Sequence, residues 1–141
     1  TDVSYLGLGP RETTADRTAG GKMGAWSYNV RQDFAQNTPV YPQECGSRTG
    51  VYRAAVTGSG LNIGIGFAGD SMTFSALPYT PHELENARHL YELPRDDNKT
   101  VVRCAAFQRG VGGDNSWGAK PHADDCFAVE KGTSFRFTIQ K

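Results

Sequence analysis

The sequence predicts an all-β fold, an antiparallel β-sandwich with one short helix. Glycine and proline contribute 17 and 7 of the 141 residues, a composition that suits many turns and short strands. Several segments alternate apolar with small or polar residues, as strands with one buried face do. Only one segment carries helix start and stop signals. By its length the chain is expected to form a single domain, residues 1–141.

Four strands are expected in the first half of the chain, each from period-two alternation: 23–30, 48–56, 61–67 and 71–76. Residues 1–22 are expected to be an extended entry followed by a turn-rich loop, and prolines and a glycine make 37–46 a loop. The clearest strand is 61–67, where every odd position is bulky and apolar. A Gly69-Asp70 turn before the next alternating segment predicts that 61–67 and 71–76 form an antiparallel hairpin.

A helix is predicted near residues 80–93. Thr80 can be the N-cap, Pro81 suits the first helical position, and Glu83 completes a capping box. Pro94 is expected to end the helix. The apolar positions that would share one helical face are Leu84, Ala87 and Tyr91.

The last third should hold three more strands, at residues 100–108, 122–128 and 134–140, with a polar turn at 95–99. In the second of these strands Cys126 and Ala128 are expected to point inward. No cysteine belongs to a C-x-x-C pair, which argues against a zinc or redox site. We therefore expect buried free thiols at Cys45, Cys104 and Cys126.

Charge and motifs exclude several classes of function. The 15 basic and 15 acidic residues cancel, which gives no electrostatic case for a nucleic acid or an anionic membrane as partner. The apolar runs are much shorter than the ~20 residues of a membrane helix. Ser116 lacks a nucleophile-elbow context, and the glycines at 110–113 lack the Lys of a phosphate loop. His82 and His89 lack metal-ligand spacing and are expected to be surface or packing residues. The residues alone therefore indicate no catalytic or metal site.

The most unusual stretch is residues 109–118, in which four glycines surround one of only two tryptophans. Asp, Asn and Ser side chains stabilise turns there without regular structure. A tryptophan held by such a loop either fills the core or is presented to a ligand, and composition leaves both readings open.

Several motifs of this chain occur in the same order in the C-terminal domain of bacterial β-galactosidases of glycoside hydrolase family 2. The motifs are Tyr5-Leu6-Gly7-Leu8-Gly9-Pro10-Arg11-Glu12 with Asp16-Arg17, Pro42-Gln43-Glu44 with Gly46 and Arg48, residues 75–93, and Gly112-Gly113-Asp114-Asn115-Ser116-Trp117. The chain resembles that domain over essentially its whole length. The resemblance implies a galactose-mutarotase-like supersandwich, of which this chain would be the second half.

The resemblance also implies a function, the hydrolysis of terminal non-reducing β-D-galactose residues by a retaining, two-carboxylate mechanism. The family's catalytic glutamates and its magnesium and sodium sites lie in a central barrel without counterpart here, which implies no catalytic residue, metal ligand or cofactor in this chain. The implied partners are that barrel, the other domains and the β-galactoside substrate. By the same resemblance Trp117 stacks on the substrate, and the neighbouring Asp114, Asn115 and Ser116 are expected to be substrate-binding residues as well. Asn115 stands where an Asp is common, which should leave the turn intact.

Two other functions remain open at this point. A free-standing carbohydrate-binding module could use the same tryptophan, and a purely structural or oligomerisation domain could bury it. Exposed sheet edges would also allow the isolated chain to form a homodimer. The sequence leaves open the glycosidic linkage and aglycone preference, and whether the compartment is the bacterial cytoplasm or periplasm.

Overall fold

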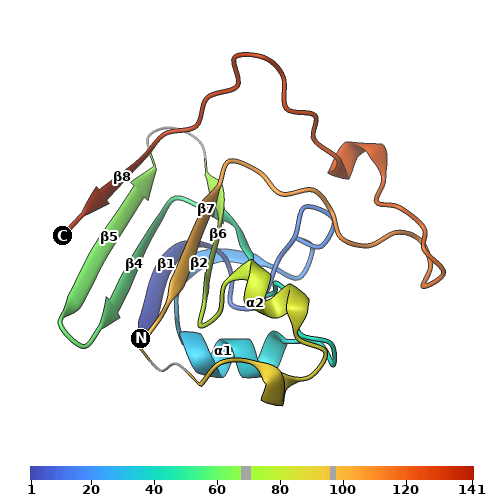
Figure 1. Ribbon diagram of the computed structural model, residues 1–141. Helices are drawn as coiled ribbons and strands as arrows, with labels where there is room; N and C mark the ends of the chain where they lie inside the picture. The colour runs from blue at the N-terminus through green and yellow to red at the C-terminus, as the bar shows by residue number, and fades with distance from the viewer. Residues whose placement is uncertain (68–70, 96–97) are drawn as a thin grey trace.

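The computed structural model describes residues 1–67, 71–95 and 98–141, and it confirms a mostly β-stranded, sandwich-like fold. A five-stranded antiparallel sheet has the order β2-β1-β4-β5-β8, and a three-stranded antiparallel sheet has the order β3-β6-β7 (Figure 1). The strands are β1 (Asp2–Gly9), β2 (Lys22–Asn29), β3 (Arg48–Val51), β4 (Arg53–Gly58), β5 (Leu61–Phe67), β6 (Met72–Leu77), β7 (Val101–Ala105) and β8 (Phe137–Gln140). The helices are α1 (Val30–Asn37) and α2 (Pro81–Asn86), with 3-10 turns η1 (Leu90–Glu92) and η2 (Ala123–Asp125).

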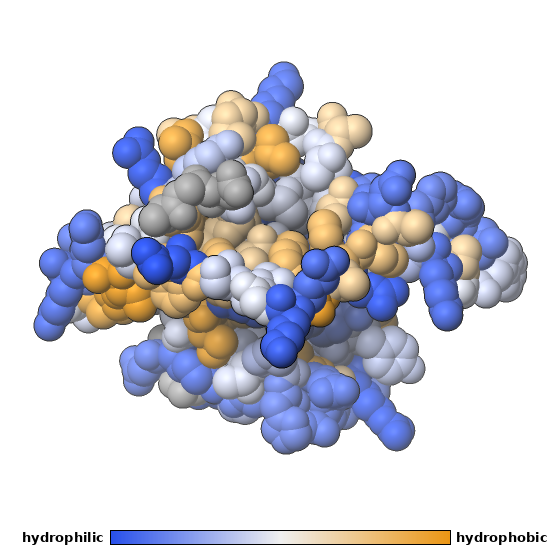
Figure 2. Space-filling view, turned by 90° about the horizontal axis from the view of Figure 1, so that it is seen from above, coloured by the Kyte–Doolittle hydropathy of each residue, from blue (hydrophilic) through white to orange (hydrophobic). Residues whose placement is uncertain are grey.

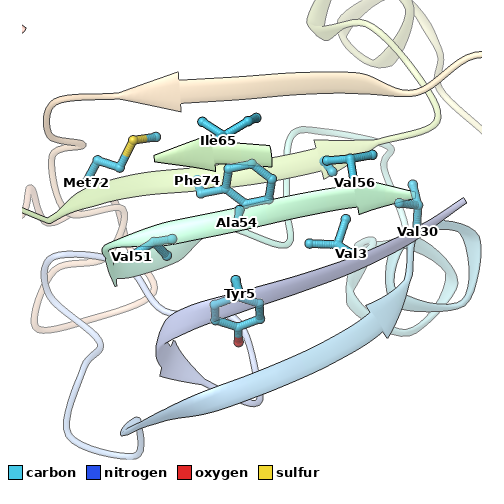
Figure 3. Close-up of a cluster of buried hydrophobic side chains, with 10 residues drawn as sticks. Val3, Tyr5, Val30, Val51, Ala54, Val56, Ile65, Met72 and Phe74 are labelled. Carbon is cyan, nitrogen blue, oxygen red and sulfur yellow. The ribbon is translucent and has the colours of Figure 1, made fainter. Parts of the chain in front are cut away.

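The core lies between the two sheets and is built from alternate strand positions. Val3 of β1, Val56 of β4 and Phe74 of β6 are all almost completely buried in one cluster. Figure 3 shows these side chains gathered between the strands that carry them. In β1 and β4 the buried residues alternate along the strand, as period-two patterning predicts.

The single strand predicted at residues 48–56 is instead two strands that belong to different sheets. The break is at Tyr52: β3 pairs with β6, whereas β4 pairs with β1 and β5. Gly50 has a φ of 62°, a left-handed conformation that favours glycine and turns the chain just before the break. The Tyr52 backbone N–H donates to the carbonyl of Leu6 at 2.9 Å, so the crossing point remains hydrogen-bonded to β1.

The predicted hairpin between residues 61–67 and 71–76 is wrong, although both strands exist. β5 pairs with β4 and β8, and β6 pairs with β3 and β7, so the two consecutive strands lie in opposite sheets. All six residues of β6 are buried, including Thr73 and Ser75, as expected of a central strand covered on both faces. The Gly69-Asp70 turn lies outside the described residues.

Of the two α-helices in the described part of the chain, α2 is the predicted one and its capping box is confirmed. The Thr80 hydroxyl accepts from the Glu83 backbone N–H at 3.2 Å, and the Glu83 carboxylate accepts from the Thr80 backbone N–H at 2.7 Å. The helix ends at Asn86, earlier than expected, and η1 follows it. Leu84 and Ala87 are buried, but Tyr91 is 79% exposed because it follows the end of the helix and does not share its face.

The helix α1 was not predicted. It begins at an Asn29 cap whose side chain accepts from the Arg31 and Gln32 backbone N–H groups. Within α1, the buried Asp33 pairs with Arg48 of β3 at 2.6 Å, and Arg48 is only 1% exposed. Both helices pack at one end of the sandwich through a second apolar cluster: Phe34, Cys45, Leu77, Leu84, Ala87 and Leu93.

The last part of the chain differs most from the expectation. The strand predicted at residues 122–128 is wrong: η2 is followed by irregular chain, with Cys126 and Ala128 exposed to solvent. The strands predicted at 100–108 and 134–140 exist but are shorter, as β7 and β8. Between these strands residues 106–136 form an arm that extends from β7, turns at η2 and passes over the top of the molecule to β8 (Figure 1).

The cysteines also divide into different environments. Cys45 is buried, Cys104 is partly buried and Cys126 is exposed, and all three are free thiols. Burial raises the pKa of Cys45 to about 12, so this thiol remains protonated at neutral pH. Uniform burial was therefore wrong for Cys126, because the segment around it is not a strand. The turn predicted at residues 95–99 lies partly outside the described residues.

Candidate functional site

The glycine-rich loop, residues 109–118, lies in the arm and presents its tryptophan to solvent. Trp117 is 92% exposed, so it does not fill the core. Asp114, Asn115 and Ser116 are exposed beside it. Viewed from above, the arm projects on one side as a mostly hydrophilic surface (Figure 2). The structure thus brings the four sequence-predicted residues together on one exposed loop.

The tip of the loop is held by Asn115. Its side-chain oxygen accepts from the Trp117 backbone N–H at 2.8 Å and from the Ala119 backbone N–H at 3.4 Å. An Asx side chain that bonds two residues ahead produces a tight turn without regular structure. Asn115 therefore acts through the backbone, and the turn that we expected at this position is present.

The two sides of the loop, at Gly113 and Ala119, come close together next to this tip. A Cβ at Gly113 would lie 2.4 Å from the carbonyl oxygen of Ala119, a distance that real Cβ atoms do not reach. Glycine is required here because the two backbone segments are nearly in contact. Lower down, the Gly110 backbone N–H donates to the carbonyl of Asp125 at 2.7 Å. The loop is therefore closed at two places, by the close approach of Gly113 to Ala119 and by the hydrogen bond between Gly110 and Asp125.

A carboxylate from a distant part of the chain contacts the start of the loop. Asp16, in the connection between β1 and β2, accepts from the Val111 and Gly112 backbone N–H groups at 3.1 and 2.7 Å. The same carboxylate accepts from the Thr14 hydroxyl at 2.6 Å. Partial desolvation acts to raise the pKa of Asp16, but the hydrogen bonds from Thr14, Gly112 and Val111 outweigh it and lower the pKa.

A side-chain pair links the loop to His122, the residue that precedes η2. His122 Nε2 lies 2.8 Å from Asp114 Oδ1. The hydrogen bond to Asp114 and the charge of this carboxylate raise the pKa of His122. Asp114 is therefore engaged by the arm itself.

An open cavity of about 410 Å³ lies between the loop and the β1–β2 connection. Charged and polar side chains line it together with loop backbone: Asp16, Arg17, Val111, Gly112, Gly113, Asp114, His122 and Asp125. Trp117 lies outside this wall, so the apolar indole and the polar cavity are separate surfaces of the same arm. Such a combination can offer an aromatic face to an apolar group and hydrogen-bonding groups to a polar ligand.

The other candidate residues do not converge on the loop. His82 is exposed and interacts with Asn86, and His89 is exposed and interacts with Glu92. Among the described residues, no group of three His, Cys, Asp or Glu side chains is placed to hold a metal ion.

The loop was predicted from the sequence, but its contacts with Asp16 and His122 were not. Asp16 belongs to a motif that we quoted, yet it is 96 residues from Gly112, and no spacing rule connects the two. His122 was placed in a strand, which concealed its pairing with Asp114. The sequence offered only the residue types of Asp16 and His122 as an indication of these contacts, with no pattern that joins either residue to the loop.

Together the fold and the site define a two-sheet β domain that displays a tryptophan on a braced loop. A family model described as "Beta galactosidase small chain" matches residues 1–139. Over 142 residues the chain is 39% identical to "Beta-galactosidase" of Lactobacillus delbrueckii subsp. bulgaricus, which covers 99% of this chain and 13% of the relative. It is 38% identical over 130 residues to "Beta-galactosidase small subunit" of Latilactobacillus sakei, covering 84% of this chain and 39% of the subunit.

These matches show that the chain belongs to the β-galactosidase small-chain family. A third relative, "Beta-galactosidase" of Halalkalibacterium halodurans, is 36% identical over 140 residues, which cover 99% of this chain and 14% of the relative. The chain therefore spans only a small part of the full-length relatives that it matches. No helix in the described part of the chain has the length and apolar character to cross a membrane.

Proposed function

We propose that the chain is a non-catalytic part of a β-galactosidase of glycoside hydrolase family 2, at the C-terminal end of the enzyme. In this proposal the complete enzyme hydrolyses terminal non-reducing β-D-galactose residues, and the catalytic carboxylates are supplied by its barrel domain. This chain packs on that barrel and supplies Trp117 to the substrate site. The observation that carries the proposal is the indole, 92% exposed on a loop braced from both sides.

The chemistry of the loop suits a sugar. One face of an indole packs against the C–H groups of a pyranose ring, and the ring N–H keeps a polar contact. Burying such a face is worth about 1–2 kcal/mol, which corresponds to about tenfold in affinity. Asp114 and Ser116 are exposed next to the indole and can meet hydroxyl groups of the same ligand. Asn115 holds the turn that carries them.

Two glutamates of this chain, Glu44 and Glu83, are engaged in ion pairs within the domain. Glu44 forms an ion pair with Arg103. Glu83 accepts from Lys99 at 2.6 Å and caps the start of α2. These structural roles support the proposal that the chain alone has no hydrolase activity. Turnover of a chromogenic β-galactoside by the isolated chain, abolished by Glu44→Gln or Glu83→Gln, would contradict the proposal.

The substrate role is tested best in an active enzyme. The segment of the Lactobacillus delbrueckii enzyme that aligns with this chain can be replaced by this chain, since the alignment covers 99% of this chain. In this chimera Trp117→Ala should raise KM for lactose about tenfold. Tyr91→Ala, which truncates another exposed aromatic residue outside the arm, is the matched control and should leave KM unchanged. An unchanged KM in the Trp117 variant would refute the substrate role.

The binding-module alternative predicts a different result for the chain alone. An exposed indole could bind a glycan without a barrel, and this observation keeps the alternative worth testing. Calorimetric titration of the isolated chain with lactose distinguishes the two functions. Binding that is lost in the Trp117→Ala variant would favour a free-standing module, whereas negligible binding would favour a site that needs its barrel.

We also propose that the isolated chain self-associates through a sheet edge. β8 forms one edge of the five-stranded sheet, and its four residues are all exposed. Phe137 and Ile139 on this strand are 41% and 64% exposed, and they line an apolar cleft of about 490 Å³. An open strand edge with apolar side chains favours pairing with another strand. Light scattering at increasing concentration should reveal a dimer, and a mass that remains monomeric would contradict this proposal.

A further inference from the structure

We propose that Asp16 is the positioning residue of the Trp117 loop: its carboxylate receives two backbone N–H groups at the loop's start and determines where the loop lies. Asp16 acts on the backbone of the loop: its carboxylate accepts hydrogen bonds from the Thr14 hydroxyl and from the Val111 and Gly112 N–H groups. Its effect on substrate binding rests on the proposed function, whereas its effect on the loop rests on geometry alone.

The carboxylate is presented from a segment that is fixed to the core. Thr14 is almost completely buried, and its carbonyl accepts from the Arg17 backbone N–H at 2.9 Å, which closes a turn around Asp16. The preceding residue, Thr13, donates its backbone N–H to the carbonyl of Ser47 at 2.9 Å, next to β3. The Thr14 hydroxyl then bonds one side of the Asp16 carboxylate. Asp16 therefore starts from a rigid support.

The opposite side of the carboxylate meets the loop. Oδ2 accepts from the N–H groups of two successive residues, Val111 and Gly112. Successive amides that converge on one anionic oxygen form a nest, and hydrogen bonds to an ionised acceptor are stronger than those to a neutral one. Because these hydrogen bonds lower the pKa of Asp16, the carboxylate is ionised at neutral pH.

The backbone also passes close to Asp16. A Cβ at Gly110 would lie 2.9 Å from Asp16 Cγ and 3.0 Å from Asp125 Cβ. The backbone at Gly110 is thus packed between Asp16 of the β1–β2 connection and Asp125 of the arm. The Gly110–Asp125 hydrogen bond joins the arm to itself, whereas the two hydrogen bonds to Asp16 join it to the sandwich. Asp16 is therefore the contact that places the closed loop relative to the two sheets.

The geometric half of the proposal can be tested on the chain itself by amide hydrogen exchange. In Asp16→Ala, exchange at Val111 and Gly112 should become at least about tenfold faster, since each loses a hydrogen bond to a charged acceptor. Asp16→Asn retains an oxygen at the same place and should give a smaller increase. Asp124→Ala removes a nearby exposed carboxylate and is the matched control. Exchange that is unchanged in Asp16→Ala would overturn the proposal.

The functional half is tested in the chimeric β-galactosidase by separating KM from kcat. Asp16→Ala should raise KM for lactose towards the value of Trp117→Ala, with kcat little changed. The double variant should be no worse than Trp117→Ala, because the two residues act on one interaction. An Asp16 residue that only stabilises the fold would reduce the amount of active enzyme and leave KM unchanged, and that result would overturn the positioning role.

The two experiments separate this inference from the proposed function. If Trp117→Ala leaves KM unchanged, the substrate role fails, and amide exchange still decides whether Asp16 positions the loop. If Trp117→Ala raises KM but Asp16→Ala changes neither KM nor exchange, the substrate role stands and the positioning role is overturned. If Asp16→Asn has a lower KM than Asp16→Ala, closer to that of the unmutated chimera, the acceptor oxygen is the part of the side chain that positions the loop.

Discussion

Trp117→Ala should leave the folding stability of the chain almost unchanged. The residue is 92% exposed, so its truncation removes little buried surface. A tryptophan side chain offers up to about 250 Å², and the remaining fraction corresponds to about 20 Å² of contact. At about 25 cal/mol per Å² this area contributes about 0.5 kcal/mol. A tryptophan that filled the core would instead cost about 3–5 kcal/mol on truncation.

Urea unfolding followed by circular dichroism distinguishes these two magnitudes. The midpoint should move little for Trp117→Ala, and the slope of the transition should stay the same. Trp26→Ala is the matched control, because Trp26 packs against the core cluster and its ring N–H donates to the carbonyl of Lys22 at 3.3 Å. We expect that variant to lose about 2–3 kcal/mol. A loss above about 2 kcal/mol for Trp117→Ala would refute the exposed placement of this residue.

Three further predictions concern other parts of the structure. Asp33→Ala leaves the buried guanidinium of Arg48 without its carboxylate and should cost about 3–5 kcal/mol in urea unfolding, and a cost below about 1 kcal/mol would contradict the pairing. Thr80→Ala should cost about 1 kcal/mol by loss of the helix cap, while Thr80→Ser should be nearly neutral. NMR titration should place the pKa of His122 above 6.5, and Asp114→Asn should return it towards that value. Because this pKa is raised on folding, the stabilisation is complete below the unfolded pKa and is lost as pH rises through the folded one.

The parts of the fold that were predictable from sequence depend on neighbouring residues. Strand β5 was found because apolar and small residues alternate without interruption from Leu61 to Phe67. The helix α2 was found because its capping box spans only Thr80 to Glu83. Alternation and capping are interactions of a segment with itself, so one segment of sequence contains the whole signal.

The choice of strand partners could not be predicted in the same way. β5 and β6 look like two halves of a hairpin, yet they belong to opposite sheets. Alternation shows that a strand has a buried face, but not which strand lies beside it. The buried ion pair between Arg48 and Asp33 was equally unpredictable. The two residues are 15 positions apart, and no local sequence pattern connects them. The helix α1 was not predicted, and only its first residue, Val30, was assigned to the preceding strand.

The candidate site was predictable to the same extent. Residues 109–118 were identified from glycine and tryptophan content. Composition left core filling and presentation equal, and only the family resemblance favoured presentation. The exposure of Trp117 decides between these two orientations, and no composition could do so. The Asp16 contact decides the loop's position, and it depends on a fold that brings residues 95 and 96 positions apart into hydrogen-bond contact.

The contacts that fix the loop would lower the entropic cost of ligand binding by the exposed Trp117. A mobile indole must lose conformational entropy when it binds, and fixing it in advance reduces that cost. The loop is fixed at its tip by Asn115, across its middle by the Asp114–His122 pair and at its start by Asp16. Asn115 and His122 act within the arm, so they determine the loop's shape, whereas Asp16 determines where that shape stands on the sandwich. Substitutions of Asn115 should therefore disorder the tip, while substitutions of Asp16 should move an intact loop away from its place on the sandwich.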